Sequence, residues 1–230
     1  MLDALLYVAL PYAAVAVALA GTVMRLRGSR VGISALPSQF LESHALRWVS
    51  PPWHVGIFGV LALHLVILAV PGPWQRLVAR PWGLFTVEAL GLALAVIALV
   101  GLVLAAWRRL FVPRVRAVST GVDLLLLAVL GGQVVLGIGV AVIDRWGAAW
   151  ATATVVPYLR SVLVLNPDPT LVTDLPVLLR LHLVGAWLLV ALLPFSRLVH
   201  ALFFPLAWLW REPQVVIFSQ TERPRSGDSQ

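Results

Sequence analysis

The chain has 230 residues, of which 60% are hydrophobic and only 12% are charged. Soluble domains carry about a quarter charged residues, so this composition excludes an ordinary soluble protein. All 17 basic residues are arginines and the net charge is +7. Because the arginines lie in short clusters between apolar runs, they indicate membrane topology signals and not a nucleic-acid-binding face. Cysteine is absent, which excludes disulfides, iron–sulfur ligation and haem attached covalently at a CxxCH motif.

Apolar runs of about twenty residues, the length that a bilayer core requires, recur along the whole chain. They predict five membrane helices, at about 4–24, 52–71, 83–106, 119–143 and 176–205. The first run has neither a basic n-region nor a cleavage site followed by a soluble domain, so we expect a membrane helix there and not a cleaved signal peptide. A shorter apolar stretch before the fifth run contains Arg160 and suits an interfacial helix better than a span.

The distribution of arginine predicts the orientation. Twelve lie in the first loop, the third loop and the C-terminal region: Arg25, Arg27, Arg30, Arg47, Arg108, Arg109, Arg114, Arg116, Arg197, Arg211, Arg223 and Arg225. The second and fourth loops carry the other five: Arg76, Arg80, Arg145, Arg160 and Arg180. Loops rich in basic residues stay in the cytoplasm, so we expect a multi-pass protein of the cell membrane with its N-terminus outside and its C-terminus inside. Residues 1–210 form the transmembrane domain and residues 211–230 a cytoplasmic tail.

Four of the five histidines lie in two of the predicted spans. His54 and His64 are in the second, and His182 and His200 are in the fifth. Ionisable side chains are rare in membrane spans and usually face a site or cavity. A single histidine could be a hydrogen-bonded core residue, but two pairs on two antiparallel helices indicate a shared site. His44 lies in a polar loop, and we assign it no role.

The directions of the two helices predict which histidines meet. His54 pairs with His200 toward the cytoplasm, and His64 pairs with His182 toward the outside. The two separations differ, at about 15 Å along the second helix and about 27 Å along the fifth. Two bare metal ions between straight helices would not tolerate this mismatch, since ligands stay within about 2 Å of a metal. A haem is wide enough to tilt between its ligands, and Pro194 can bend the fifth helix.

We therefore favour two b-type haems over structural histidines. The predicted fold is an all-α integral membrane protein with five transmembrane helices, which binds the haems between helices two and five. Two axial histidines favour electron transfer over oxygen chemistry. Gly56, Gly59 and Gly185 in the same spans would let a flat macrocycle approach the backbone, but close helix packing in membranes uses glycine equally often.

Three motifs resemble the gamma subunit family of respiratory nitrate reductase. Members of this family are membrane di-haem b cytochromes. They are WHVGIFGVLALH (53–64), RRLFVPRVRAVSTGVD (108–123) and RLHLVGAWLLVALLPFSRLVH (180–200). The order and spacing of the four histidines and the five-span plan agree with that family. The resemblance implies that His54 and His200 are the axial iron ligands of a proximal haem and that His64 and His182 are those of a distal haem. The helix directions give the same pairs independently.

The resemblance also implies an enzymatic role. Subunits of this family oxidise membrane quinol near the periplasmic side and pass electrons through both haems to a cytoplasmic iron–sulfur subunit. Nitrate is reduced on a partner molybdenum subunit, because this chain has no plausible nitrate-reducing centre. The alternatives are a haem b subunit of another redox complex, related to sulfur or heterodisulfide chemistry, and a non-redox membrane anchor or transporter whose histidines relay protons.

One departure from the family affects the quinol site. We expect a lysine near the start of the third span, and this chain has none. Arg76, Arg80 and Glu88 are the nearby ionisable candidates. Glu88 could accept quinol protons, or it could form a salt bridge with Arg80 at the surface.

Other charged residues near the predicted span ends have two possible roles each. Arg197, Arg108 and Arg109 could pair with haem propionates, since guanidinium groups suit that geometry, or they could anchor the helices at the membrane edge. Asp123 follows the sequence STG and could cap the fourth helix or pair with a loop arginine, and we favour the cap.

Overall fold

The computed structural model describes residues 1–28 and 43–198, with side chains described at 1–28 and from Val49 onward. Every element in these ranges is helical. The elements are α1 (Leu2–Ala4), the π-helix η1 (Leu5–Ala9), α2 (Leu10–Gly28), α3 (Ser43–Ala69), α4 (Pro71–Val78), α5 (Pro81–Phe111), α6 (Pro113–Arg116), α7 (Gly121–Ile143), α8 (Gly147–Trp150), α9 (Val155–Leu163), α10 (Thr170–Thr173), α11 (Val177–Leu192) and the 3₁₀ turn η2 (Leu193–Phe195). The all-α prediction is therefore confirmed.

Five helical segments are long and apolar enough to cross a membrane. They are Leu2–Arg27, Val49–Ala69, Pro81–Phe111, Gly121–Ile143 and Val177–Phe195. This confirms the five predicted spans; the ends of the first four differ from the prediction by at most five residues, whereas the fifth ends about ten residues earlier. Large apolar side chains such as Leu65, Val103 and Phe111 are exposed on these helices. Such exposure suits a surface covered by lipid.

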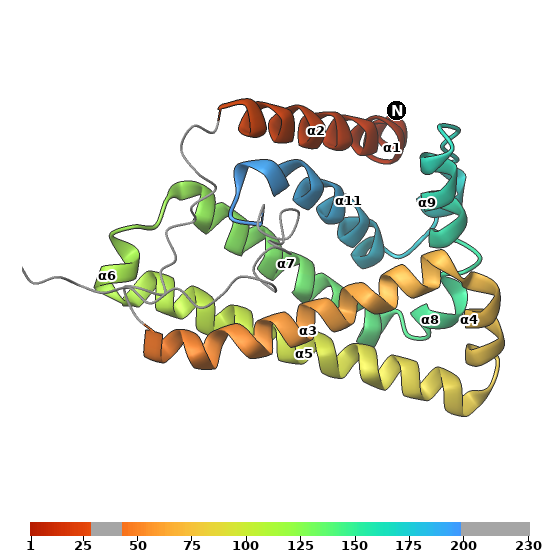
Figure 1. Ribbon diagram of the computed structural model, residues 1–230. Helices are drawn as coiled ribbons and strands as arrows, with labels where there is room; N and C mark the ends of the chain where they lie inside the picture. The colour runs from red at the N-terminus through yellow and green to blue at the C-terminus, as the bar shows by residue number, and fades with distance from the viewer. Residues whose placement is uncertain (29–42, 199–230) are drawn as a thin grey trace, which may run out of the picture. The chain divides into compact units, whose positions relative to one another are not determined.

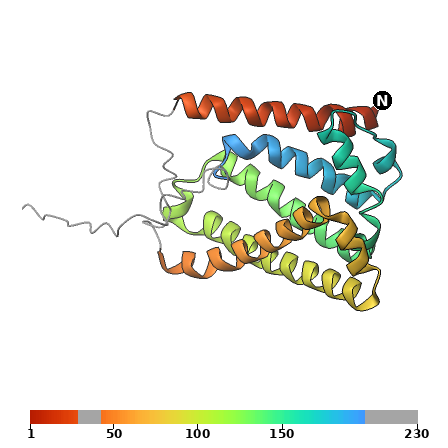
Figure 2. The ribbon, with the colours of Figure 1, turned by 45° about the vertical axis from the view of Figure 1, so that its right-hand side comes forward.

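The five spans lie side by side in an order that differs from the chain order. Figures 1 and 2 show α2 next to α11, followed by α7, α5 and α3. The helix α3 packs along α5 for most of its length, whereas α3 and α11 have no extended contact within the described residues. The connecting helices α4, α8 and α9 gather at one end of the spans, and α6 lies at the other (Figure 1).

Glycine allows the close packing of α3 against α5. A Cβ atom at Gly56 would collide with the backbone of Ala98, and one at Gly101 would collide with the backbone of Trp53. A Cβ atom at Gly59 would lie 2.6 Å from the side chain of Leu94. Of the two uses considered for Gly56 and Gly59, the structure therefore shows helix packing.

The fourth span begins with the predicted cap. The N–H of Asp123 donates to Thr120 Oγ1 (3.3 Å), and the N–H of Thr120 donates to Asp123 Oδ2 (3.0 Å). This reciprocal pair is a capping box, which satisfies two backbone donors that the first turn of a helix leaves unpaired. The capping role expected for Asp123 is confirmed.

The fifth span is not the single helix over 176–205 that the sequence predicts. The α-helix ends at Leu192, the next three residues form the turn η2, and Ser196 is extended (φ −113°, ψ 176°). Pro194 explains the break, because proline has no N–H to continue the helical ladder and its ring clashes with the preceding turn. The prediction of one continuous helix over 176–205 is therefore wrong, because the α-helix ends at Leu192. His200 itself and the predicted domain boundary at 210 lie outside the described residues.

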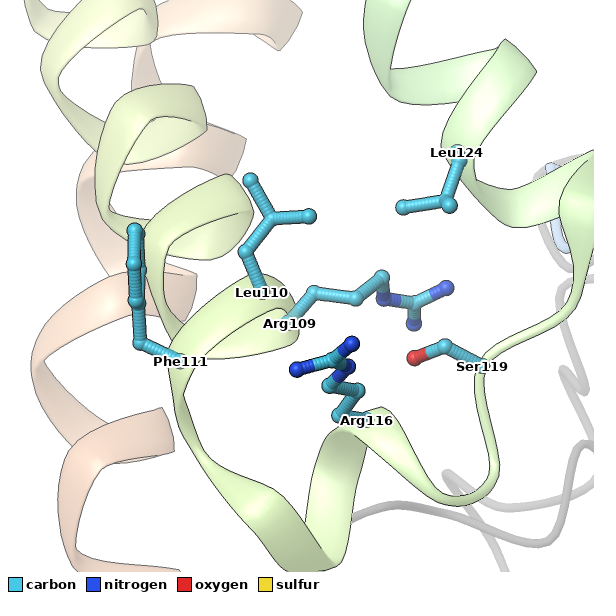
Figure 3. A pocket seen from close by; sticks show the side chains of 6 residues that line it. All are labelled: Arg109, Leu110, Phe111, Arg116, Ser119 and Leu124. Atoms are coloured by element: carbon cyan, nitrogen blue, oxygen red, sulfur yellow. The ribbon is translucent and has the colours of Figure 1, made fainter.

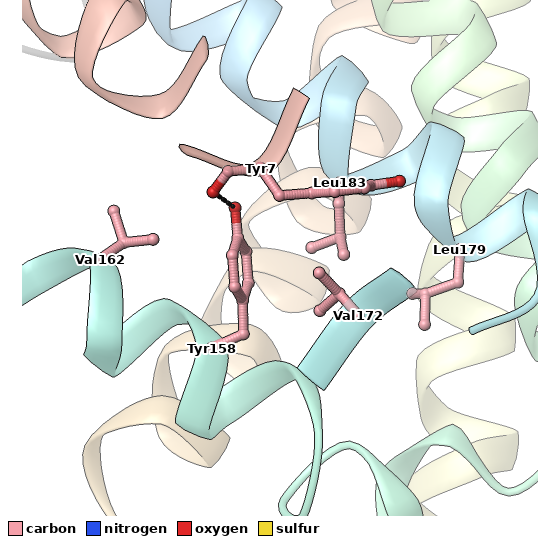
Figure 4. Close-up of a cluster of buried hydrophobic side chains, with 6 residues drawn as sticks. All are labelled: Tyr7, Tyr158, Val162, Val172, Leu179 and Leu183. Carbon is pink, nitrogen blue, oxygen red and sulfur yellow. Dashed lines mark hydrogen bonds between the residues drawn. The ribbon is translucent and has the colours of Figure 1, made fainter. Parts of the chain in front are cut away.

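The segment after the fourth span folds onto the N-terminal span. A buried cluster joins the two segments through Tyr7, Tyr158, Val162, Val172, Leu179 and Leu183 (Figure 4). The Tyr158 hydroxyl donates to the carbonyl oxygen of Tyr7 (3.0 Å), and the two rings meet edge to face. Burial raises the pKa of Tyr158 to about 12, so the hydroxyl remains a protonated donor at physiological pH. A short helix predicted around Arg160 is present as α9.

Replacing Tyr158 with phenylalanine should lower the thermal stability of the detergent-solubilised chain. The change leaves the Tyr7 carbonyl without its side-chain donor in a fully buried position, at a cost of about 1–3 kcal/mol. Tyr12→Phe is the matched control, because its hydroxyl donates to Val162 O from a half-buried position. Melting curves followed by circular dichroism should show a larger drop for Tyr158→Phe, and equal drops would contradict this account.

Candidate functional site

The structure brings together one of the two predicted histidine pairs. The ring centroids of His64 on α3 and His182 on α11 are 6.3 Å apart, with their planes inclined by 36°. A metal about 2 Å from one nitrogen of each imidazole would place the ring centres about 6 Å apart. The separation of the two rings would allow His64 and His182 to hold a single metal centre between them. They meet although their helices do not otherwise pack along one another.

Hydrogen bonds on α3 set the tautomers of both its histidines. His64 Nδ1 lies 2.8 Å from the carbonyl oxygen of Val60, and His54 Nδ1 lies 2.8 Å from that of Ser50. A carbonyl only accepts, so these contacts favour the tautomer with the proton on Nδ1 and the lone pair on Nε2; Ser50 Oγ also lies 3.0 Å from His54 Nδ1. This arrangement is typical of histidines that ligate a metal. The proposed partner of His54, His200, lies outside the described residues.

The side chains at the site favour a metal bound within a porphyrin over a bare metal ion. Within the described residues, no group of three or more His, Asp or Glu side chains could hold a bare metal ion. Two imidazoles alone are an incomplete ligand set for zinc, whereas they complete the coordination of a porphyrin iron. The residues that are present therefore fit haem better than a free cation.

Buried polar atoms without partners gather around the same helices. Among the described residues, five such side-chain atoms have no hydrogen-bond partner: Gln133 Oε1, Asp144 Oδ2, Arg180 Nε, His182 Nδ1 and Trp187 Nε1. All five belong to α7, to the residue that caps it, or to α11. Arg180 and Trp187 lie near the side chains of Tyr7 and Tyr158, and the His182 ring lies near the backbone of Gln133. These atoms therefore belong to several places along α7 and α11.

Two arginines considered as propionate partners pair with Asp123. Arg197 Nε donates to Asp123 Oδ1 (2.8 Å), and Arg109 Nη1 lies 2.9 Å from Asp123 Oδ2. Asp123 is only 4% exposed, so this ionic cluster joins α5, α7 and the segment after η2 in a partly desolvated position. Arg108 is also buried. The propionate role of the three arginines stays a prediction.

A pocket of about 480 Å³ borders the same cluster. It is lined by Arg109, Leu110, Phe111, Arg116, Ser119 and Leu124. Figure 3 shows the guanidinium groups of Arg109 and Arg116 near Ser119, with apolar side chains around them. Neither His64 nor His182 is among the described residues that line it, so this pocket is separate from the imidazole pair.

The candidate quinol residues lie near the start of α5. Glu88 Oε1 accepts a hydrogen bond from the N–H of Ala148 on α8 (2.8 Å), and within the described residues it makes no ion pair with Arg80. Trp74 Nε1 donates to the carbonyl oxygen of Ala148 (2.7 Å). Glu88 and Trp74 therefore bind the two backbone polar groups of one residue of α8, the N–H and the carbonyl oxygen of Ala148. Arg80 is exposed at the N-cap of α5.

Comparison with known proteins identifies the family. The family model described as nitrate reductase gamma subunit matches residues 3–219. The chain belongs to the nitrate reductase gamma subunit family. The resemblance inferred from the three sequence motifs is thereby confirmed.

Relatives of the gamma subunit family align over most of the chain. It is 32% identical to the respiratory nitrate reductase 1 gamma chain of Escherichia coli over 90% of this chain and 93% of that one. It is 29% identical to the nitrate reductase gamma chain of Bacillus subtilis over 88% and 92% of the two chains. It is also 32% identical to the nitrate reductase-like protein NarX of Mycobacterium tuberculosis. That alignment covers 98% of this chain but only 36% of the other protein.

Two residues near the imidazole pair of this gamma-family chain were missed by the sequence analysis. Gln133 donates from Nε2 to the backbone carbonyl of His182 (2.8 Å). A Cβ atom at Gly137 would lie 3.1 Å from His182 Cε1, so glycine leaves room for the ring. The available signal was an amide in the middle of the fourth apolar run, where polar side chains are rare.

Replacing Asp123 with alanine should destabilise the helical bundle. The substitution removes the capping box and leaves Arg109 and Arg197 without their shared carboxylate, and breaking such a pair costs about 3 kcal/mol. Asp174→Ala, at an exposed aspartate, is the control. The melting temperature in detergent should fall for Asp123→Ala and stay unchanged for Asp174→Ala. A variant that melts with the wild type would show that the cluster does not stabilise the fold.

Glu88→Ala should loosen α8. Without its acceptor the Ala148 N–H loses one of the bonds that hold the segment 144–154, so backbone amide exchange there should accelerate. Glu88→Gln keeps a carbonyl acceptor and should retain slow exchange. Hydrogen–deuterium exchange with mass spectrometry distinguishes the two variants, and unchanged exchange in Glu88→Ala would refute the anchoring role.

Proposed function

We propose that this chain is the membrane di-haem b subunit that anchors a respiratory nitrate reductase, oxidises quinol near the periplasmic side and delivers electrons to a cytoplasmic iron–sulfur subunit. The facing imidazoles of His64 and His182 are the observation that carries the proposal, together with membership of the gamma subunit family. When bound, the two haems supply one-electron carriers that connect the two faces of the bilayer.

The four histidines would hold these groups in pairs. His64 and His182 are the proposed axial ligands of the distal haem, and His54 and His200 those of the proximal haem. His54 and His64 are ten residues apart on the continuous helix α3, which separates them by about 15 Å along its axis. This spacing supports two centres at different depths. The hydrogen bonds from Nδ1 to Ser50 and Val60 orient both rings on α3 for ligation through Nε2.

The proposed location is the cell membrane, with the N-terminus outside and the C-terminus in the cytoplasm. The excess of arginine in the first loop, the third loop and the C-terminal region supports this orientation. The clustering of α4, α8 and α9 at one end of the spans is consistent with the second and fourth loops sharing a side (Figure 2).

Quinol oxidation releases protons as well as electrons, so a proton acceptor is needed near the distal pair. We propose Glu88, with Arg80 nearby, in place of the lysine that this chain lacks. Glu88 already accepts a hydrogen bond from the N–H of Ala148, so protonation of Glu88 would weaken this bond between α5 and α8. Nitrate reduction would take place on a molybdenum subunit that contacts the iron–sulfur subunit.

The haem content of the purified chain tests the proposal. The wild type should contain two haems b per chain by pyridine haemochromogen assay, with a dithionite-reduced minus oxidised spectrum of the b type. His64→Ala should reduce the count to about one, because a single remaining ligand cannot hold the distal group.

The matched control is His44→Ala, at the histidine to which no role is assigned, and it should keep both haems. A well-folded wild type without haem, prepared from haem-replete cells, would overturn the cytochrome proposal and favour a non-redox anchor or proton relay.

A further inference from the structure

The orientation of His182 is supplied by a neighbouring helix and not by its own. On α3, the rings of His54 and His64 each donate to a carbonyl one turn earlier. His182 Nδ1 is buried and makes no hydrogen bond to its own helix within the described residues, and the ring lies near the backbone of Gln133 on α7. Its ring must therefore be positioned by what packs against it. The helix that does so is α7, which packs along α11.

The contact between α7 and His182 has two parts. Gly137 lies against the ring, where any larger side chain would crowd Cε1. One turn away, the Gln133 amide donates to the main-chain carbonyl of His182 at 2.8 Å. That carbonyl is in an α-helix and has a second lone pair for the side-chain donor. The backbone and the ring of the same residue are thus both fixed from α7.

Gln133 fits closely into the surface of α11. A Cβ atom at residue 185 would overlap Gln133 Oε1, so Gly185 makes the space for the carboxamide. Gln133 Oε1 is itself buried and without a partner in the described part of the chain. An amide in the middle of an apolar span is costly unless it is used.

We propose that Gln133 is a positioning residue for the distal haem ligand, fixing His182 through its main-chain carbonyl and setting the polarity beside the ring. This inference rests on the proposed function, since it assumes that His182 binds haem iron. Residues that orient a metal ligand tune the reduction potential of the metal and its spectrum. Gln133 should therefore affect the distal centre selectively.

The test is Gln133→Met in the full chain, which keeps the length of the side chain and removes both polar atoms. The readouts are haem per chain, the electron paramagnetic resonance spectrum of the oxidised protein, and a potentiometric titration that resolves the two haems. The signal that disappears in His64→Ala identifies the distal centre. In Gln133→Met that signal should shift in both the spectrum and the midpoint potential, or be lost, while the other stays unchanged.

Gln75→Met is the matched control, because Gln75 also donates a side-chain hydrogen bond, to Thr152, but on α4. It should leave both signals unchanged. If Gln133→Met fails to accumulate, Gln133→Asn replaces it, since the shorter amide cannot reach the His182 carbonyl at the same distance.

Two failures are distinguishable. A wild type with two haems and a Gln133 variant with identical spectra and potentials would overturn this inference alone. A wild type without haem would overturn the proposed function, and this inference with it.

Discussion

The absence of water inside a bilayer makes every polar side chain in a membrane span costly, and this constraint governs the arrangement of the described helices. The polar groups within the spans are used in pairs across helices or against the backbone. His64 meets His182, Gln133 binds the His182 carbonyl, and Asp123 binds two guanidinium groups. The other buried polar atoms without a hydrogen bond among the described residues lie on α11, on α7 and on the residue that caps α7.

The two ends of the helical bundle are fastened by different interactions. At the end that carries α6, the Asp123 cluster joins three segments through charge-assisted hydrogen bonds. At the other end the hydrogen bonds are neutral: Tyr158 attaches α9 to the first span, and Trp74 and Gln75 join α4 to α8 and to the turn that follows α8. Between these ends, α3 is held by α5 and leaves its histidine side toward α11 without close helix packing. Such an arrangement keeps α3 and α11 apart while the rings of His64 and His182 still meet.

Features that depend on local pattern could be predicted from the sequence. The apolar runs gave the five spans, the Thr120–Asp123 spacing gave the cap, and the antiparallel directions of two spans paired His64 with His182. The motifs around the histidines also identified the family. Features that depend on a distant partner could not be predicted. Glu88 binds a backbone N–H on α8, and Gln133 binds a backbone carbonyl on α11, and a backbone group has no sequence signal. The prediction of a continuous fifth helix was wrong, because we expected Pro194 to bend the helix and the helix instead breaks there.

The most direct test of the central claim is the electron paramagnetic resonance spectrum of the oxidised, purified wild-type chain. Two histidines on one iron give a low-spin ferric centre, whereas an iron with a single protein ligand is typically high-spin. The account predicts low-spin ferric haem signals, with no substantial high-spin component. A predominantly high-spin spectrum, or no haem signal in folded protein, would contradict the claim that His64 and His182 face each other across one iron.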